Sequence, residues 1–76
     1  MTATKIMLSS INDVKNLVNI VNKYDFDIDL ISDRYVVDAK SIMGIFSLDL
    51  LSPITLIAHT KTPEKLFEKL ARFAVN

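Results

Sequence analysis

The chain has 76 residues, half of them hydrophobic, with nine basic and nine acidic side chains and no cysteine. This length predicts a single domain, residues 1–76, and the balanced charge argues against binding to nucleic acid. Without cysteine there is no disulfide and no thiolate metal site. Because the sequence shows no long apolar run and no signal peptide, we expect a cytoplasmic protein that does not insert into membranes.

A strand and a helix are predicted in the first third of the chain. Residues 4–9 form a strand candidate of weak propensity. Ser10 and Asp13 then resemble a capping box, with aspartate in place of the usual glutamate. Apolar residues recur at helical spacing from there to about Lys23, which predicts a helix with one buried face. The members of that face are Ile11, Val14, Leu17, Val18 and Val21.

Residues 25–30 show the clearest strand pattern. Three apolar residues alternate with three aspartates, so the two kinds lie on opposite faces. Carboxylates are the ligands that hard cations prefer, but alternate strand residues lie roughly 6.6–7 Å apart, too far for a compact cage without loop ligands. We therefore expect a solvated acidic face and no metal. Residues 32–34 are predicted to form a turn and residues 35–37 the returning strand of a hairpin.

A short helix is predicted from Ser41 to about Leu50. Ser41 stands in the N-cap position, as a small hydroxyl residue ahead of an apolar run. The residues spaced to face the core are Ile42, Ile45 and Leu48. Met43 and Phe46 then form a second apolar stripe, which either meets a partner or packs beneath a loop.

A strand and a last helix complete the chain. Residues 53–59 are rich in β-branched side chains and open with proline, which the first position of a strand tolerates. The last helix is predicted to start with Thr62 as N-cap, Pro63 at its first position and Glu64 in its first turn. Its predicted buried residues are Leu66, Leu70, Phe73 and Ala74, with Phe67 alongside. The order strand-helix-strand-strand-helix-strand-helix predicts an α+β fold, a small antiparallel sheet with helices on one face.

The segment after residue 39 resembles a known family. Lys40-Ser41-Ile42-Met43-Gly44, followed by Ser47-Leu48, is similar to the regulatory serine segment of HPr, the phosphocarrier protein of the bacterial sugar phosphotransferase system. The order of elements is also that of the HPr fold, a four-stranded open-faced β-sandwich, so the resemblance extends over essentially the whole chain. It implies that Ser41 opens a short helix, that a dedicated kinase phosphorylates Ser41, and that the apolar residues after it dock partners.

The phosphoryl-accepting site of the family is not matched. In HPr, a histidine at the start of the first helix lies in the pattern glycine, apolar, histidine, any residue, arginine, proline. This histidine accepts the phosphoryl group from Enzyme I. The corresponding positions here are Ser9, Ser10, Ile11 and Asn12, and the stretch has no glycine, histidine, arginine or proline. Asp13 would add a negative charge where a phosphoryl group approaches. We therefore expect no histidine phosphotransfer, no catalytic residue and no enzyme activity.

The sequence favours a regulatory or docking module that acts through the Ser41 helix. Ser41 is the candidate phosphorylation site, with a simple N-cap as the alternative role, and phosphate there would lie beside Lys40. The candidate docking residues are Lys40, Ile42, Met43 and Phe46. The expected partner is a protein such as an HPr kinase or a transcriptional regulator. No cofactor is expected, and the chain should be a monomer or a weak dimer.

Two alternatives stay open. The chain could be a divergent phosphocarrier whose acceptor is His59, its only histidine, or Ser10. A lone histidine at the end of a strand is, however, most often a structural or surface residue. The chain could instead be an oligomerisation or small-molecule-binding module that uses the open face of the sheet, where Met7 and Ile57 would form an apolar surface.

Overall fold

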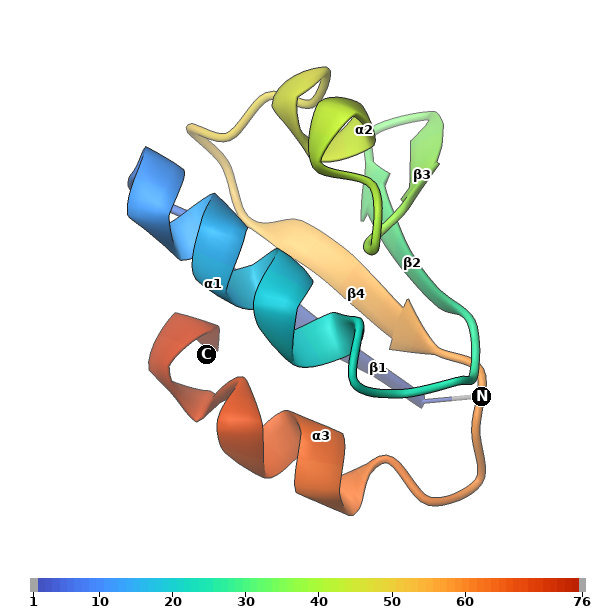
Figure 1. The fold of residues 1–76 in the computed structure, drawn as a ribbon. Coiled ribbons are helices and arrows are strands. Elements are labelled where there is room, and N and C mark those ends of the chain that lie inside the picture. The colour runs from blue at the N-terminus through green and yellow to red at the C-terminus, as the bar shows by residue number, and fades with distance from the viewer. Residues whose placement is uncertain (1, 76) are drawn as a thin grey trace.

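The computed structural model describes residues 2–75 and shows four strands and three α-helices in that part of the chain (Figure 1). Their order is β1 (Thr2–Ile6), α1 (Ile11–Val21), β2 (Ile28–Ser32), β3 (Tyr35–Asp38), α2 (Ile42–Phe46), β4 (Ile54–Ala58) and α3 (Glu64–Lys69), followed by the 3-10 helix η1 (Ala71–Phe73). None of the helices described is long and apolar enough to cross a membrane.

The sheet is antiparallel, with the strand order β1-β4-β2-β3. The helices pack on one of its faces and leave the other face open (Figure 1). The predicted α+β fold, an open-faced sandwich with a four-stranded antiparallel sheet, is therefore confirmed.

The core lies between the helices and one face of the sheet. In β4, Ile54, Leu56 and Ala58 are fully buried, and β2 contributes Ile28 and Leu30. Because side chains alternate across a strand, the remaining residues of β4 point to the open face. From α1 the core receives Val14, Leu17 and Val21. The predicted strand at residues 53–59 and the predicted buried face of the first helix are confirmed, except that Ile11 is exposed and Val18 is only partly buried.

Two strands are displaced along the chain by two or more residues from their predicted positions, while β3 and β4 differ from theirs by one residue at one or both ends. The strand predicted at residues 4–9 is instead Thr2–Ile6, because Met7 leaves the sheet and its N–H donates to the carbonyl of Phe73 at 2.8 Å. The strand predicted from residue 25 begins only at Ile28. The apolar–acidic alternation does continue through residues 25–27, but the carbonyl of Phe26 accepts a hydrogen bond from a lysine side chain instead of pairing with a strand.

Helices α2 and α3 are shorter than predicted. α2 ends at Phe46 because the N–H groups of Ser47 and Leu48 donate to carbonyls only three residues back, which tightens and closes the last turn. At α3, the residue before the helix is Pro63, and the Thr62 hydroxyl contacts Thr60 instead of capping the helix. Leu66, Leu70 and Phe73 are buried as predicted, whereas Ala74 is exposed.

The two edges of the sheet are built differently. At β1, the C-terminal segment covers the outer edge, since Ala74 bridges Ile6 and the N–H of Val75 donates to the carbonyl of Lys5 at 3.0 Å. β3 forms the other edge, and it follows a two-residue turn made by Asp33 and Arg34. Asp33 has a φ of 54°, a left-handed conformation that aspartate adopts more readily than most residues.

Candidate functional site

The N-terminus of α1 is closed by its own side chains. Ser10 is the N-cap, and its hydroxyl oxygen accepts a hydrogen bond from the N–H of Asp13 at 3.1 Å. The Asp13 carboxylate turns back and accepts hydrogen bonds from the N–H of Ser9 at 2.9 Å and from its hydroxyl at 2.8 Å. The predicted capping box is thus present with one difference, because the carboxylate binds Ser9 and not the N-cap residue itself.

These contacts fix a negative charge at the start of α1. The hydrogen bonds from the N–H and hydroxyl of Ser9, with Arg72 at 3.9 Å, hold the pKa of Asp13 below its usual value of 3.8. Asp13 is therefore ionised at neutral pH, and it repels the anionic group that a phosphocarrier must accept. Ser10 stands where this helix begins, and the neighbouring Ile11 and Asn12 are exposed without any imidazole beside them.

α2 has the two faces that its sequence predicts. Ser41 is extended, and its hydroxyl oxygen accepts a hydrogen bond from the N–H of Gly44 at 3.2 Å, as an N-cap does. Ile45 and Leu48 are buried and Ile42 is partly buried. On the outer stripe, Met43 is 78% and Phe46 45% exposed. The alternative that both residues pack beneath a loop is wrong for Met43, while their role in docking stays a prediction.

An apolar hollow of about 340 Å³ lies between α2 and the start of α1. Its lining residues are Met7, Leu8, Ser9, Ser10, Ile11, Phe46, Leu50 and Leu51. The sequence did not predict this hollow, because alternation placed Met7 on the open sheet face and helical spacing placed Ile11 in the core. Met7 lies beyond the end of β1 and escapes strand alternation, and Ile11, the first residue of α1, is 63% exposed.

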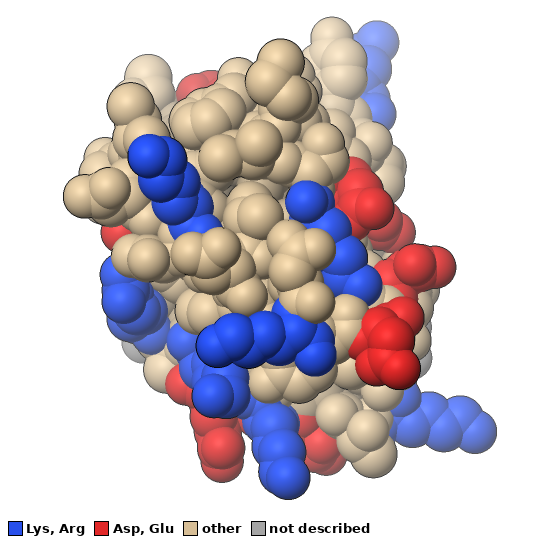
Figure 2. Space-filling model, viewed as in Figure 1, with Lys and Arg blue, Asp and Glu red and all other residues tan. Residues whose placement is uncertain are grey.

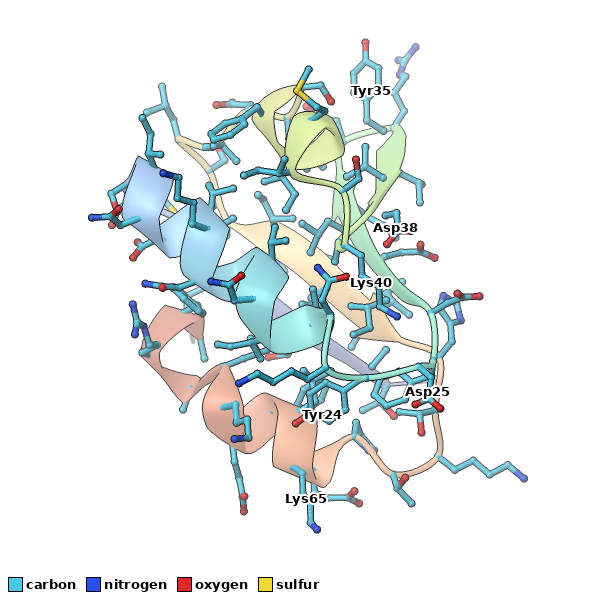
Figure 3. The ribbon with its side chains drawn as sticks, viewed as in Figure 1. Tyr24, Asp25, Tyr35, Asp38, Lys40 and Lys65 are labelled. Atoms are coloured by element: carbon cyan, nitrogen blue, oxygen red, sulfur yellow. The ribbon has the colours of Figure 1, made fainter. Side chains whose placement is uncertain are left out.

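Lys40 has a structural role that its sequence position does not reveal. Its Nζ donates to the carbonyl oxygens of Tyr24 at 2.6 Å and Phe26 at 3.0 Å. Figure 3 shows the Lys40 side chain directed from the entrance of α2 toward the connection between α1 and β2. The ammonium group therefore satisfies two carbonyls of an irregular segment. The predicted docking role of Lys40 is untested.

His59 lies far from the start of α1. It directly follows β4, whose five residues span roughly 17 Å. The opposite end of β4 pairs with the end of β1 from which the chain continues to Ser10, so His59 and Ser10 lie toward opposite ends of the sheet. Its Nε2 lies 2.8 Å from a carboxylate oxygen of Asp29, and its main-chain N–H donates to the carbonyl of Asp27.

An acidic hollow of about 510 Å³ surrounds His59. It is lined by Asp27, Asp29, Asp38 and His59. Acidic side chains gather along the right-hand edge of the molecule in Figure 2, the side on which Figure 3 labels Asp25 and Asp38. Within residues 2–75, no three histidine or acidic side chains are grouped so that they could hold a metal ion.

Comparison with known proteins identifies the family. A model of the PTS-HPr family, described as the PTS HPr component phosphorylation site, matches residues 12–76. The chain belongs to the HPr family. The resemblance seen in the sequence is thus confirmed, and the match begins only at Asn12, after Ser9, Ser10 and Ile11. The comparison with curated protein sequences gives no match.

Solved structures of HPr-family proteins share the fold. HPr-C-His from Thermoanaerobacter tengcongensis is 26% identical, with a TM-score of 0.78 over 95% of this chain and 89% of that one. The phosphocarrier protein HPr of Bacillus anthracis str. Ames is 28% identical, with a TM-score of 0.74 over 97% and 96% of the two chains. The catabolite repression protein Crh of Bacillus subtilis, a domain-swapped dimer, is 28% identical, with a TM-score of 0.68 over 93% and 88%.

The contacts of Lys40 predict a stability effect. Lys40→Met keeps the apolar stem but leaves the carbonyls of Tyr24 and Phe26 without the ammonium donor, so we expect the free energy of unfolding to fall by about 1–3 kcal/mol. Urea unfolding followed by circular dichroism measures this change. Lys15→Met, at an exposed position of α1, is the control and should cost less than about 0.5 kcal/mol. Equal losses in the two variants would contradict a structural role for Lys40.

The lowered pKa of Asp13 predicts a pH dependence of stability. Because the pKa is below 3.8 in the folded chain, the Asp13 contacts stabilise the fold fully above that value and are lost as pH falls through the folded pKa. Asp13→Asn should therefore be less stable than the parent at neutral pH, and the difference should shrink in acid. Urea unfolding at a series of pH values tests this. Ser9→Ala removes one donor and should show a smaller deficit of the same sign, whereas a deficit that grows in acid would refute the assignment.

Proposed function

We propose that this protein is an HPr-family member that does not carry phosphate on histidine and that acts in the cytoplasm by binding a partner protein through α2. The observation that carries the proposal is the outer stripe of α2, where Met43 and Phe46 are exposed next to the apolar hollow. Exposed apolar side chains that adjoin one another are typical of protein-binding surfaces. The surface begins directly after Ser41, the residue that the family resemblance singles out.

The start of α1 supports the absence of phosphotransfer. A phosphocarrier needs a nucleophile there and groups that stabilise an incoming anion. This chain has an N-cap serine whose hydroxyl holds the N–H of Asp13, together with the ionised carboxylate of Asp13 itself. His59, the other acceptor considered, is paired with Asp29 and lies among further carboxylates, which oppose the approach of a phosphoryl donor.

Ser41 supports a regulatory role for the same surface. Its side chain is exposed and two residues from Met43, so a phosphate would add about 1.5 to 2 negative charges at the border of the apolar stripe. The ammonium of Lys40 is occupied by two carbonyls, and the N–H of Gly44 already donates to the Ser41 hydroxyl oxygen. Phosphorylation would thereby change the charge of the docking surface more than its shape.

The chemistry of the surface indicates the kind of partner. A protein that presents apolar side chains to Met43, Phe46 and the hollow would bury surface that is now exposed. An HPr kinase and a transcriptional regulator are the two partner classes that the family resemblance implies. The kinase would need access to Ser41 itself, and the regulator would respond to the charge placed there.

Phosphate incorporation tests the proposal directly. With phosphoenolpyruvate and Enzyme I, we expect no acid-labile phosphate, whereas HPr of Bacillus anthracis serves as the positive control. With ATP and an HPr kinase, intact mass should rise by one phosphate, and Ser41→Ala should abolish the gain. Ser47→Ala removes a neighbouring hydroxyl and should leave the gain intact. Phosphate on His59 or Ser10 would replace this proposal with a divergent phosphocarrier.

Docking through α2 predicts a second, separable effect. Met43→Glu places a charge in the apolar stripe without touching the core, so kcat/KM for phosphorylation by the kinase should fall about tenfold or more with stability unchanged. Ala71→Glu introduces the same charge at an exposed position of η1 and is the matched control. Equal rates for the two variants would show that the kinase does not use Met43.

A further inference from the structure

The unpaired edge of β3 carries an inference beyond partner binding through α2. An edge strand presents free N–H and carbonyl groups that can pair with another strand. The opposite edge, β1, is covered by the C-terminal segment through Ala74 and Val75. Val36 lies at the centre of the outer edge of β3 and is 61% exposed. No hydrogen bond from another segment within residues 2–75 reaches it.

The pairing with β2 shows which groups face outward. The N–H of Ala39 donates to the carbonyl of Ile28, so the main-chain groups of Tyr35 and Val37, an even number of residues away, also point to β2. The alternate residues, Val36 and Asp38, therefore direct their N–H groups away from the sheet. The carbonyl of Asp38 already accepts from the N–H of Ser41 at 3.0 Å, so β3 offers the N–H and carbonyl of Val36 and the N–H of Asp38.

The side chains along this edge are self-complementary. Arg34 and Asp38 stand two residues on either side of Val36 and carry opposite charges. In an antiparallel pair of two β3 strands centred on Val36, the register extended to the turn residue just before each strand places Arg34 opposite Asp38 of the other copy. Opposite charges directly across an antiparallel pair are stabilising.

The position of Asp38 in its own sheet also favours an arginine from a second copy. The register places Asp38 directly opposite Asp29, a like-charge pair that is unfavourable in an antiparallel sheet. Asp29 is in contact with His59, and the Asp38 carboxylate accepts a hydrogen bond from the N–H of Lys40 at 2.8 Å, but no basic side chain within residues 2–75 forms an ion pair with Asp38. An arginine from a second copy would supply that positive charge.

We propose that β3 is a self-association site, at which its outer edge pairs antiparallel with β3 of a second copy of this chain about a two-fold axis through Val36. The two copies exchange the N–H and carbonyl bonds of Val36 and align Arg34 with Asp38 at both ends. The sheet then continues across the axis. Tyr35, labelled in Figure 3 where β3 begins, lies opposite Val37 of the other copy. A strand of four residues buries little area, so the dimer is weak, with a dissociation constant of about 0.1–1 mM.

Sedimentation equilibrium from about 0.02 to 2 mM tests the proposal. The weight-average mass should rise with concentration. Val36→Pro removes the outward N–H without removing a bond to β2 and should abolish the rise. Val36→Thr keeps the N–H and the β-branched shape and should retain it. A mass that stays that of one chain at 2 mM, or association that survives Val36→Pro, would overturn the proposal.

Charge substitutions at Arg34 and Asp38 test the proposed register of the two β3 strands without removing a main-chain hydrogen-bonding group. Arg34→Asp and Asp38→Arg each place like charges opposite one another and should weaken self-association about tenfold or more. Mixing the two variants restores both opposite-charge pairs, so the mixture should associate more tightly than either variant alone. Circular dichroism checks that each variant is folded. If Val36→Pro is not folded, the result with Arg34→Asp, a change in the exposed turn, decides the proposal. A mixture no tighter than its components would refute this register.

Discussion

The pairing of β4 on both of its edges is the constraint on which the rest of the structure depends. β4 bonds to β1 on one side and to β2 on the other, while its alternate residues Ile54, Leu56 and Ala58 are fully buried. A shift of one residue would turn these side chains to the open face, so the register is fixed. The helices pack on the buried face only. The register therefore also sets which side of the sheet the helices cover.

Within that frame, the start of α1 and the start of α2 are stabilised by separate contacts. The start of α1 needs acceptors for its free N–H groups, and the Ser10 hydroxyl accepts from one of them, while the Asp13 carboxylate binds the N–H of Ser9 just before the helix. The fold does not require a histidine at that position. α2 keeps its own N-cap serine, its buried residues and its exposed stripe. The proposed function requires this separation, because the start of α1 can change without altering the exposed stripe of α2.

Patterns within one segment of the sequence predicted the helices and strands that are determined by neighbouring residues. A run of β-branched and apolar residues that opens with proline located β4, and a hydroxyl residue before an apolar run located α2 and its two faces. Long-range contacts account for what was missed. β2 begins late because Lys40, 14 residues from Phe26, binds the carbonyl that a strand would have used. The apolar hollow joins Met7 and Ile11 to residues 46–51, and no single segment contains that pattern. The contact of His59 with Asp29, 30 residues away in the sequence, could not be predicted from a single segment either.

The division of α2 into an inner and an outer stripe has an evolutionary consequence. Ile45 and Leu48 are enclosed by the core, where a change of even one methylene is costly, while Met43 projects almost entirely into solvent. Mutations on the outer stripe can therefore accumulate without lowering the stability on which selection for folding acts. On the proposed function, partner recognition and folding rest on different residues of α2 and of the turn that follows it, so related chains could diverge in the partners they bind while they keep one fold.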